Sequence, residues 1–166
     1  MVKLMKPKLV LMCGPPGSGK TTLARKLAAD IPAIRLCTDD WQAALKVSHS
    51  DEAFHDLLED QLWAFGQDLI KLGQSVIFEK GLWRRGERDE KRREAQELGV
   101  DIEFHYFDVP VDELVRRLEK RNAEGNLNAC PVSKEQMQDY FKNFQPPDEA
   151  ELALFAVSIV HRHLRS

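Results

Sequence analysis

The clearest chemical pattern in the sequence is a glycine-rich segment followed at once by a lysine and two threonines. Residues 14–21 fit the spacing G-x-x-x-x-G-K-[ST], in which glycines let backbone N–H groups converge on phosphate oxygens. The lysine would place its charge on the β- and γ-phosphates, and the first threonine would bind Mg²⁺ through its hydroxyl. The predicted nucleotide-binding residues are Gly14, Pro15, Pro16, Gly17, Ser18, Gly19, Lys20, Thr21 and Thr22.

Carboxylates end two of the predicted strands. A phosphotransferase needs a carboxylate within hydrogen-bond reach of the acceptor hydroxyl, to orient it and to accept its proton. Asp39 is the predicted base and substrate-binding residue, and its neighbour Asp40 is expected to cap the helix that begins near Trp41. Glu79 has the position of a Walker-B acid and is predicted, with Thr21, to hold magnesium; the alternative is a surface acid at a strand end.

Arginines follow two of the predicted strands. Arg84 and Arg88 would bind an anionic substrate if they face the cleft, although most such charges lie on solvated helix faces. Arg117 and Arg121 are four residues apart, on one face of a predicted helix, and precede a polar segment predicted to be a lid over residues 122–133. With Lys20 they are the predicted catalytic cations, and the alternative for them is salt bridging on the helix surface.

Aromatic side chains are candidates for a wall of the acceptor site. Trp41 lies next to the acidic pair, and Phe54 and Trp63 lie on the helix that follows. Each could stack on a substrate, although core packing is the more common role for an aromatic residue. The five histidines are scattered without metal-ligand spacing, which predicts structural or solvent-exposed roles.

These residues need a scaffold that brings strand ends together. Short apolar runs at 9–13, 33–37, 75–78, 102–107 and 153–160 are predicted strands, and helical patterns at 20–29, 41–45, 51–72, 84–98, 111–122 and 133–144 alternate with them. Such alternation predicts an α/β fold of the P-loop NTPase type. Its five-stranded, mostly parallel sheet would carry helices on both faces and bind ligands at the carboxyl ends of the strands.

Length and composition fit one domain spanning residues 1–166. The net charge of -3 gives no general attraction to nucleic acid or anionic membranes. Three separated cysteines indicate neither a disulfide framework nor a zinc site, and no apolar run approaches the roughly 18 residues of a membrane helix. We therefore expect a cytoplasmic protein that has no membrane partner, while its oligomeric state stays open.

Several segments together resemble a known family. The phosphate loop, residues 38–41, residues 81–88 and residues 108–122 are similar to the small AAA-type P-loop kinases grouped with zeta toxins and chloramphenicol phosphotransferase. They also resemble the kinase domain of bacteriophage polynucleotide kinase. The resemblance spans residues 9–147 and implies Asp39 as base and Arg117 or Arg121 as lid residue. It departs at Gln42, where the phage enzyme has an arginine three positions after its catalytic aspartate, which weakens the case for a polynucleotide substrate.

The expected activity is transfer of the γ-phosphate of ATP, with Mg²⁺, to a hydroxyl of a small-molecule acceptor such as an antibiotic, sugar or nucleoside. One alternative is a nucleoside or polynucleotide 5′-kinase, with nucleic acid as the less favoured partner. An alternative of another class is a nucleotide-dependent switch or partner-binding ATPase. The sequence shows no base-reading motif, so the choice between ATP and GTP stays open.

Overall fold

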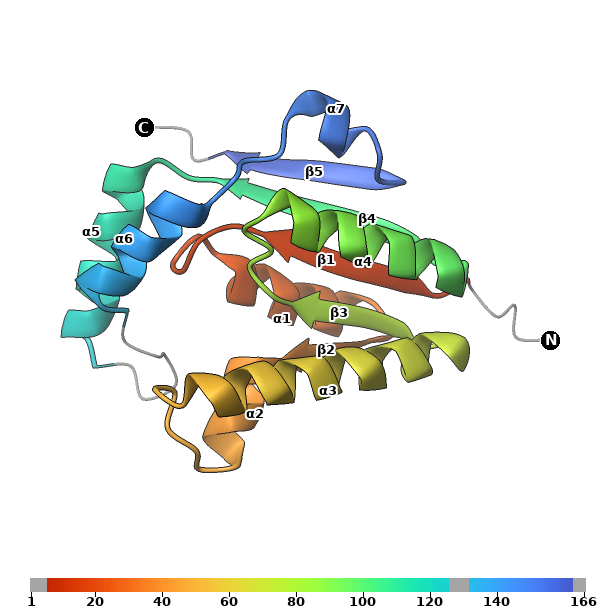
Figure 1. Ribbon diagram of the computed structural model, residues 1–166, viewed down its shortest axis with the longest axis horizontal. Helices are drawn as coiled ribbons and strands as arrows, with labels where there is room; N and C mark the ends of the chain where they lie inside the picture. Colours follow the sequence, from red (N-terminus) through yellow and green to blue (C-terminus); the bar gives the residue numbers. More distant parts are fainter. Residues whose placement is uncertain (1–5, 126–131, 163–166) are drawn as a thin grey trace.

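Five parallel strands form the centre of the computed structural model, which describes residues 6–125 and 132–162 (Figure 1). Their order across the sheet is β2-β3-β1-β4-β5. The strands are β1 (Lys8–Cys13), β2 (Ala33–Cys37), β3 (Ser75–Glu79), β4 (Asp101–Asp108) and β5 (Val157–Arg162). All neighbouring pairs are parallel, so the prediction of a mostly parallel sheet is confirmed in a stricter form.

Helices cover both faces of this sheet. They are α1 (Lys20–Asp30), α2 (Thr38–Ala44), α3 (Glu52–Lys71), α4 (Arg85–Leu98), α5 (Val111–Ala123), α6 (Lys134–Asn143) and α7 (Glu149–Leu152). Figure 1 shows α3 and α4 in front of the sheet and α1 behind it, with α5 and α6 beside the ends to which the strand arrows point. This arrangement confirms the predicted α/β fold of the P-loop NTPase type.

The alternation of side chains along β1 divides the core into two layers. Leu9 and Leu11 pack with residues of α3 and α4, whereas Val10 and Met12 pack with α1 residues such as Ala24. All four β1 side chains are fully buried, as a strand covered on both faces requires. The apolar run that predicted this strand thus reflects its central place in the sheet.

Helix ends follow their local sequence signals. Asp51 accepts a hydrogen bond from the Phe54 backbone and caps α3, and Ser133 caps α6 in a capping box with Gln136. Gly73 and Gly99 adopt positive φ after α3 and α4, where a side chain would be strained. These signals explain why α3 and α6 begin, and why α3 and α4 end, close to the predicted residues.

Two predicted boundaries were wrong. The helix expected to begin near Trp41 begins at Thr38, directly after β2, and Asp40 therefore lies inside its first turn and does not cap it. The last strand begins at Val157 and not at residue 153, because residues 153–156 form the turn that follows the short helix α7. Residues 126–131 of the predicted lid lie outside the described residues, and none of the described helices is long and apolar enough to cross a membrane.

Candidate nucleotide and acceptor site

The glycine-rich loop joins the carboxyl end of β1 to the start of α1. Gly17 and Gly19 adopt φ values of 78° and 105°, a left-handed backbone that other residues adopt only with strain. The Gly14 backbone N–H donates to the Gly81 carbonyl at 3.0 Å, which fixes the loop against the segment after β3. The loop therefore has the backbone shape that lets N–H groups point at an anion at the N-terminus of α1.

Lys20 is the first residue of α1, and its side chain reaches back to this loop. Its Nζ donates to the carbonyl oxygens of Gly14 at 2.9 Å and Pro15 at 2.7 Å. Burial lowers the pKa of Lys20 to about 8, while the charges of Glu79 and Asp39 act to raise it. The predicted phosphate-binding lysine, the predicted base and the predicted Walker-B acid therefore lie close enough to interact electrostatically.

Thr21 and Glu79 meet at the edge of the loop. The Thr21 hydroxyl donates a short hydrogen bond to Glu79 Oε1, while Arg35 donates from Nε to Glu79 Oε2 at 2.7 Å. Thr21 thus offers a ligand oxygen at the predicted magnesium position, and Glu79 beside it would hold a water bound to the ion, while phosphate oxygens and further water would supply the other ligands. Within the described ranges, no cluster of three or more histidine, cysteine or acidic side chains could hold a metal by itself. The residues present therefore fit a magnesium ion that arrives with the nucleotide.

The acidic pair divides between two roles. Asp40 forms an ion pair with Arg35 at 2.5 Å, so it stabilises the junction of β2 and α2 from within the helix. Asp39 is exposed by 60%, and its Oδ1 lies 3.8 Å from Nδ1 of His55 on α3. Asp39 is therefore the carboxylate of the pair that an acceptor can reach.

The two predicted lid arginines project from α5 toward the phosphate loop. Arg117 donates to Glu113 at 2.6 Å and reaches the Gly17 carbonyl at 3.5 Å. The charge of Arg121 lowers the pKa of Lys20, which indicates that the two cations lie near one another. Leu118 packs against Gly17 between them, so α5 lies directly over the loop.

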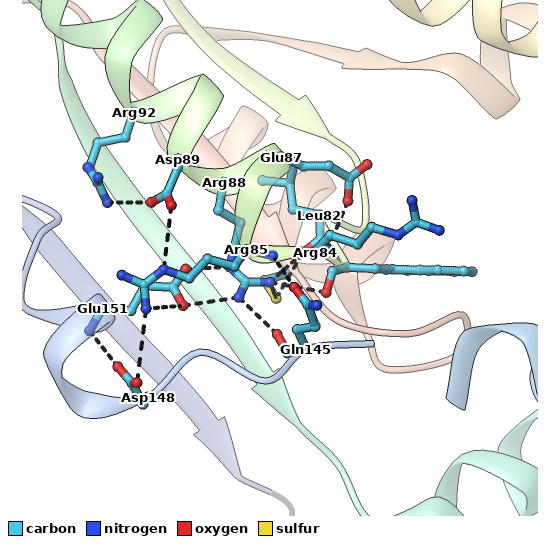
Figure 2. A network of polar contacts seen from close by, with 12 residues as sticks. Leu82, Arg84, Arg85, Glu87, Arg88, Asp89, Arg92, Gln145, Asp148 and Glu151 are labelled. Carbon is cyan, nitrogen blue, oxygen red and sulfur yellow. Dashed lines mark hydrogen bonds and ion pairs between the residues drawn. The ribbon is translucent and has the colours of Figure 1, made fainter. Parts of the chain in front are cut away.

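Arg88 does not face the cleft, and the structure contradicts its predicted role in substrate binding. Its side chain is 1% exposed and forms a bidentate pair with Glu151, at 2.5 Å from Nε and 3.0 Å from Nη2 (Figure 2). It also donates to three backbone carbonyls, those of Leu82, Trp83 and Gln145. All its directed donors are used within the fold, so Arg88 stabilises the segment between β3 and α4.

The remaining substrate candidates have mixed outcomes. Arg84 stays exposed and donates to Asn143 at 3.2 Å, so it connects the segment after β3 to α6, the helix that follows the predicted lid. Trp41 is 43% exposed beside Asp39 and can still line an acceptor site. Trp63 is only 6% exposed and packs on Phe78 at a ring distance of 5.0 Å, so its proposed place in a wall was wrong.

Two polar residues of the site, Arg35 and His55, were missed by sequence reasoning. Arg35 lies in the middle of β2, where a charged residue in an apolar run signals a buried partner. His55 lies between Asp39 and the ion pair of Glu59 with Lys80. Its Nε2 lies 3.9 Å from Glu59 Oε2, and Lys80 Nζ lies 2.5 Å from Glu59 Oε1. The helical spacing of His55 and Glu59 was visible in the sequence, but their distance from Asp39 depends on how α2 packs on α3.

The fold and this site together define a P-loop protein of the kinase-like type. A family model described as an AAA domain matches residues 9–147, and the chain belongs to that family. None of the curated proteins matches the chain.

Solved structures share the architecture. A proposed kinase from Chloroflexus aurantiacus superposes with a TM-score of 0.70 at 22% identity, covering 95% of this chain and 89% of its own. The Mycobacterium tuberculosis APS kinase CysC, solved with AMPPNP and APS, has a TM-score of 0.60 at 21% identity, covering 93% and 88%. A chain of the Pnkp1/Rnl/Hen1 RNA repair complex has a TM-score of 0.68 at 27% identity, covering 82% of this chain and only 43% of its own. These likenesses agree with the fold, and the acceptor has to be argued from the site.

Proposed function

We propose that this protein transfers the γ-phosphate of ATP to a hydroxyl group of a small molecule. The observation that carries the proposal is the placement of an exposed carboxylate, Asp39, within electrostatic reach of the phosphate-binding Lys20. A phosphotransferase needs these two groups on opposite sides of the transferring phosphoryl group. A protein that only binds nucleotide has no need of an exposed carboxylate there.

The proposed reaction divides the work among four side chains. The acceptor oxygen forms a bond to the γ-phosphorus, the bond to the β–γ bridging oxygen breaks, and ADP leaves, while the hydroxyl proton passes to Asp39. Lys20 neutralises charge on the phosphate oxygens, and Arg117 and Arg121 do so from α5. Magnesium held near Thr21 and Glu79 would offset charge on the β- and γ-phosphates. Catalysis then rests on positioning and electrostatics, with ADP and a phosphate ester as products.

The buried position of Gln42 argues against a polynucleotide acceptor. Gln42 is fully buried, and its amide donates to the Ser48 carbonyl at 2.7 Å. It lies where the resembling phage kinase has an arginine three residues after its catalytic aspartate. A buried neutral amide can offer a nucleic-acid phosphate neither charge nor access. This supports a small-molecule acceptor over a nucleic-acid end.

The charges on the acceptor side also favour an uncharged acceptor. Lys80 lies 2.5 Å from Glu59 and 3.5 Å from Glu87, so its charge is offset by two carboxylates. The charge of Arg88 is paired with that of Glu151 in the interior, so Arg88 is not available to an anionic acceptor. An acceptor bearing phosphate or carboxylate groups would meet acidic side chains beside Asp39, whereas neutral hydroxyl-rich molecules would find hydrogen-bond partners.

The test is phosphate transfer from γ-labelled ATP with Mg²⁺ to a panel of antibiotics, sugars, nucleosides and oligonucleotide 5′-ends. Asp39→Asn removes the base with little change of shape, and Lys20→Ala removes the phosphate-binding charge. We expect label on a small neutral acceptor, loss of transfer with intact ATP binding in Asp39→Asn, and loss of transfer with weakened ATP binding in Lys20→Ala. ATP binding without any labelled acceptor would instead support the switch alternative, and near-normal transfer by Asp39→Asn would show that another group is the base.

A further inference from the structure

Leu82 has an unusual backbone conformation for a buried leucine. Its φ of 42° lies in the left-handed region, and the residue is 1% exposed in the core that α3 and α4 cover. A residue with a Cβ adopts this region at a cost in free energy, so the surrounding contacts have to hold it there. Strained residues gather at functional sites, and Leu82 follows Gly81, whose carbonyl contacts the phosphate loop.

The contact that holds Leu82 comes from a buried cation. Arg88 Nη1 donates to the Leu82 carbonyl at 3.0 Å (Figure 2), and Cys13 Sγ donates to the same oxygen at 3.4 Å. Glu151 holds the Arg88 guanidinium through two hydrogen bonds in the interior. Arg88 therefore cannot turn away from Leu82 without leaving the charge of Glu151 buried and unpaired.

The preceding carbonyl holds the phosphate loop. The Gly81 carbonyl accepts from the Gly14 backbone N–H at 3.0 Å. Only the two backbone dihedral angles of Leu82 separate this carbonyl from the carbonyl that Arg88 fixes. A negative φ at Leu82 would rotate the peptide plane between Gly81 and Leu82 and turn the Gly81 carbonyl away from Gly14. The strained conformation thus lets one segment contact Arg88 and the phosphate loop at the same time.

Gly14 connects this contact to the phosphate-binding lysine. Its carbonyl accepts from Lys20 Nζ at 2.9 Å. The two glycines are closely packed, since a Cβ added to Gly81 would lie 3.1 Å from the Gly14 oxygen and one added to Gly14 would lie 2.9 Å from Phe107 Cβ. The Gly81 carbonyl therefore determines where the phosphate loop begins, and with it where Lys20 finds its partner.

We propose that Arg88 is a positioning residue that holds the phosphate loop in its ATP-binding shape by fixing the strained turn at Leu82. The inference rests on the proposed function, because it gives this loop the role of binding ATP. Arg88 itself is buried away from the nucleotide and acts through Leu82, Gly81 and Gly14. Without Arg88, Leu82 relaxes to a negative φ, and the apparent ATP affinity falls with the fraction of molecules that keep the binding-competent loop.

The substitution Leu82→Gly separates this role from a general effect on folding. Glycine adopts positive φ without strain, so the turn no longer needs Arg88. We expect Arg88→Met to weaken MgATP binding by about tenfold, the change in population that corresponds to the strain of one left-handed residue. Leu82→Gly alone, and the double variant Arg88→Met with Leu82→Gly, should bind within about threefold of wild type. The control Arg85→Met removes an arginine 3.6 Å from the same Glu151 carboxylate and should stay within about twofold.

Thermal unfolding of the same proteins completes the experiment. Both substitutions remove buried contacts, so the double variant should have the lowest unfolding midpoint of the set. Calorimetry below all the midpoints measures the MgATP affinities. A restored affinity in the least stable protein excludes a loss of affinity caused by lower stability.

The outcomes distinguish the inference from the function beneath it. If wild type binds no ATP, the proposed function fails and the positioning role of Arg88 fails with it. If wild type binds ATP and Arg88→Met binds it equally well, only the positioning role is overturned. A double variant that binds as weakly as Arg88→Met would also overturn it, because relief of the strain at Leu82 would then have no effect on the loop.

A comparison that keeps Arg88 covers the case in which Arg88→Met does not fold. Leu82→Ala and Leu82→Gly remove nearly the same buried side chain, and the glycine variant of such a pair is ordinarily the less stable one because glycine loses more entropy on folding. At a strained positive φ the order reverses, so we expect the higher unfolding midpoint for Leu82→Gly. A lower midpoint for Leu82→Gly would mean that Leu82 is not strained, and the proposal would fall.

Discussion

Arg35 Nε donates a hydrogen bond to Glu79 Oε2 at 2.7 Å, from the middle of one strand to the end of its neighbour. Parallel pairing of β2 with β3 sets Arg35 beside Ile77 and Cys37 beside Glu79, so the long arginine side chain reaches two residues along the sheet. The other Glu79 oxygen accepts from Thr21. Arg35 therefore holds the Glu79 carboxylate against the start of α1, where the magnesium of the nucleotide would bind.

This relationship predicts a magnesium phenotype for Glu79→Gln. The amide keeps the size of the side chain but removes its charge and one acceptor, so a water bound to the magnesium ion would lose its hydrogen-bond acceptor. We expect the Mg²⁺ concentration for half-maximal transfer to rise about ten- to a hundredfold, the usual effect of losing an outer partner of a metal. A titration of transfer rate against Mg²⁺ measures it, with the exposed Glu97→Gln as control. An unchanged midpoint would mean that Glu79 is only a structural partner of Arg35.

The lowered pKa of Lys20 predicts proton uptake when ATP binds. In the nucleotide-free protein this pKa is about 8, so at a pH near 8 about half of the molecules carry a neutral Lys20. Phosphate charges favour the protonated lysine, so binding raises its pKa and draws a proton from the buffer. ATP affinity should therefore fall as the pH rises through about 8, while below about pH 7 this uptake vanishes because Lys20 is already charged.

Calorimetry of ATP binding in buffers with different ionisation heats measures this uptake directly. At a pH near 8 we expect about half a proton per nucleotide in wild type. Lys20→Met, which binds more weakly but keeps the loop, should show none. Uptake that persists in Lys20→Met would assign the proton to another group.

The arrangement of α5 predicts that its arginines differ in their effect on turnover. Arg117 and Arg121 lie toward the phosphate loop, whereas Arg116 is exposed and paired with Glu113. We expect alanine at either of the first two positions to lower kcat by about a hundredfold or more, with a smaller change in the KM for ATP. Arg116→Ala should stay within about twofold of wild type, since exposed ion pairs contribute little. Steady-state kinetics on all three variants is the measurement, and equal effects would rule out the lid role.

Local signals in the sequence predicted much of this fold correctly. The spacing of Gly14 to Lys20 between an apolar run and a helical pattern identified the phosphate loop, because both its chemistry and its backbone shape depend on neighbouring residues. The caps at Asp51 and Ser133 also depend only on residues three positions away. Such features can be predicted because they are determined within one or two turns of the chain.

Contacts between distant elements could not be predicted in the same way. Whether Arg88 faces water or the core depends on Glu151, which is 63 positions away on a one-turn helix with no visible periodicity. The approach of His55 to Asp39 likewise depends on the packing of α2 on α3. The sequence thus showed which residues could do chemistry, and the tertiary arrangement decided which of them meet.

The buried pair of Arg88 and Glu151 carries the last prediction. Both residues are 1% exposed, and the carboxylate accepts two hydrogen bonds from the guanidinium. Removing one partner leaves the other charge buried without compensation, so we expect Glu151→Ala to lower the free energy of unfolding by about 3 kcal/mol or more. Urea denaturation of the full chain measures this loss.

A double-mutant cycle then separates the pair from its surroundings. Arg88→Met should destabilise as well, because the carbonyls of Leu82, Trp83 and Gln145 lose their donors. The combination of Arg88→Met with Glu151→Leu should cost less than the sum of Arg88→Met and Glu151→Leu alone, since neither charge is left unpaired. Arg85→Ala is the control: Arg85 lies 3.6 Å from the same carboxylate but is half-buried, so its removal should cost about 1 kcal/mol or less. Strict additivity would mean that the two charges do not stabilise one another.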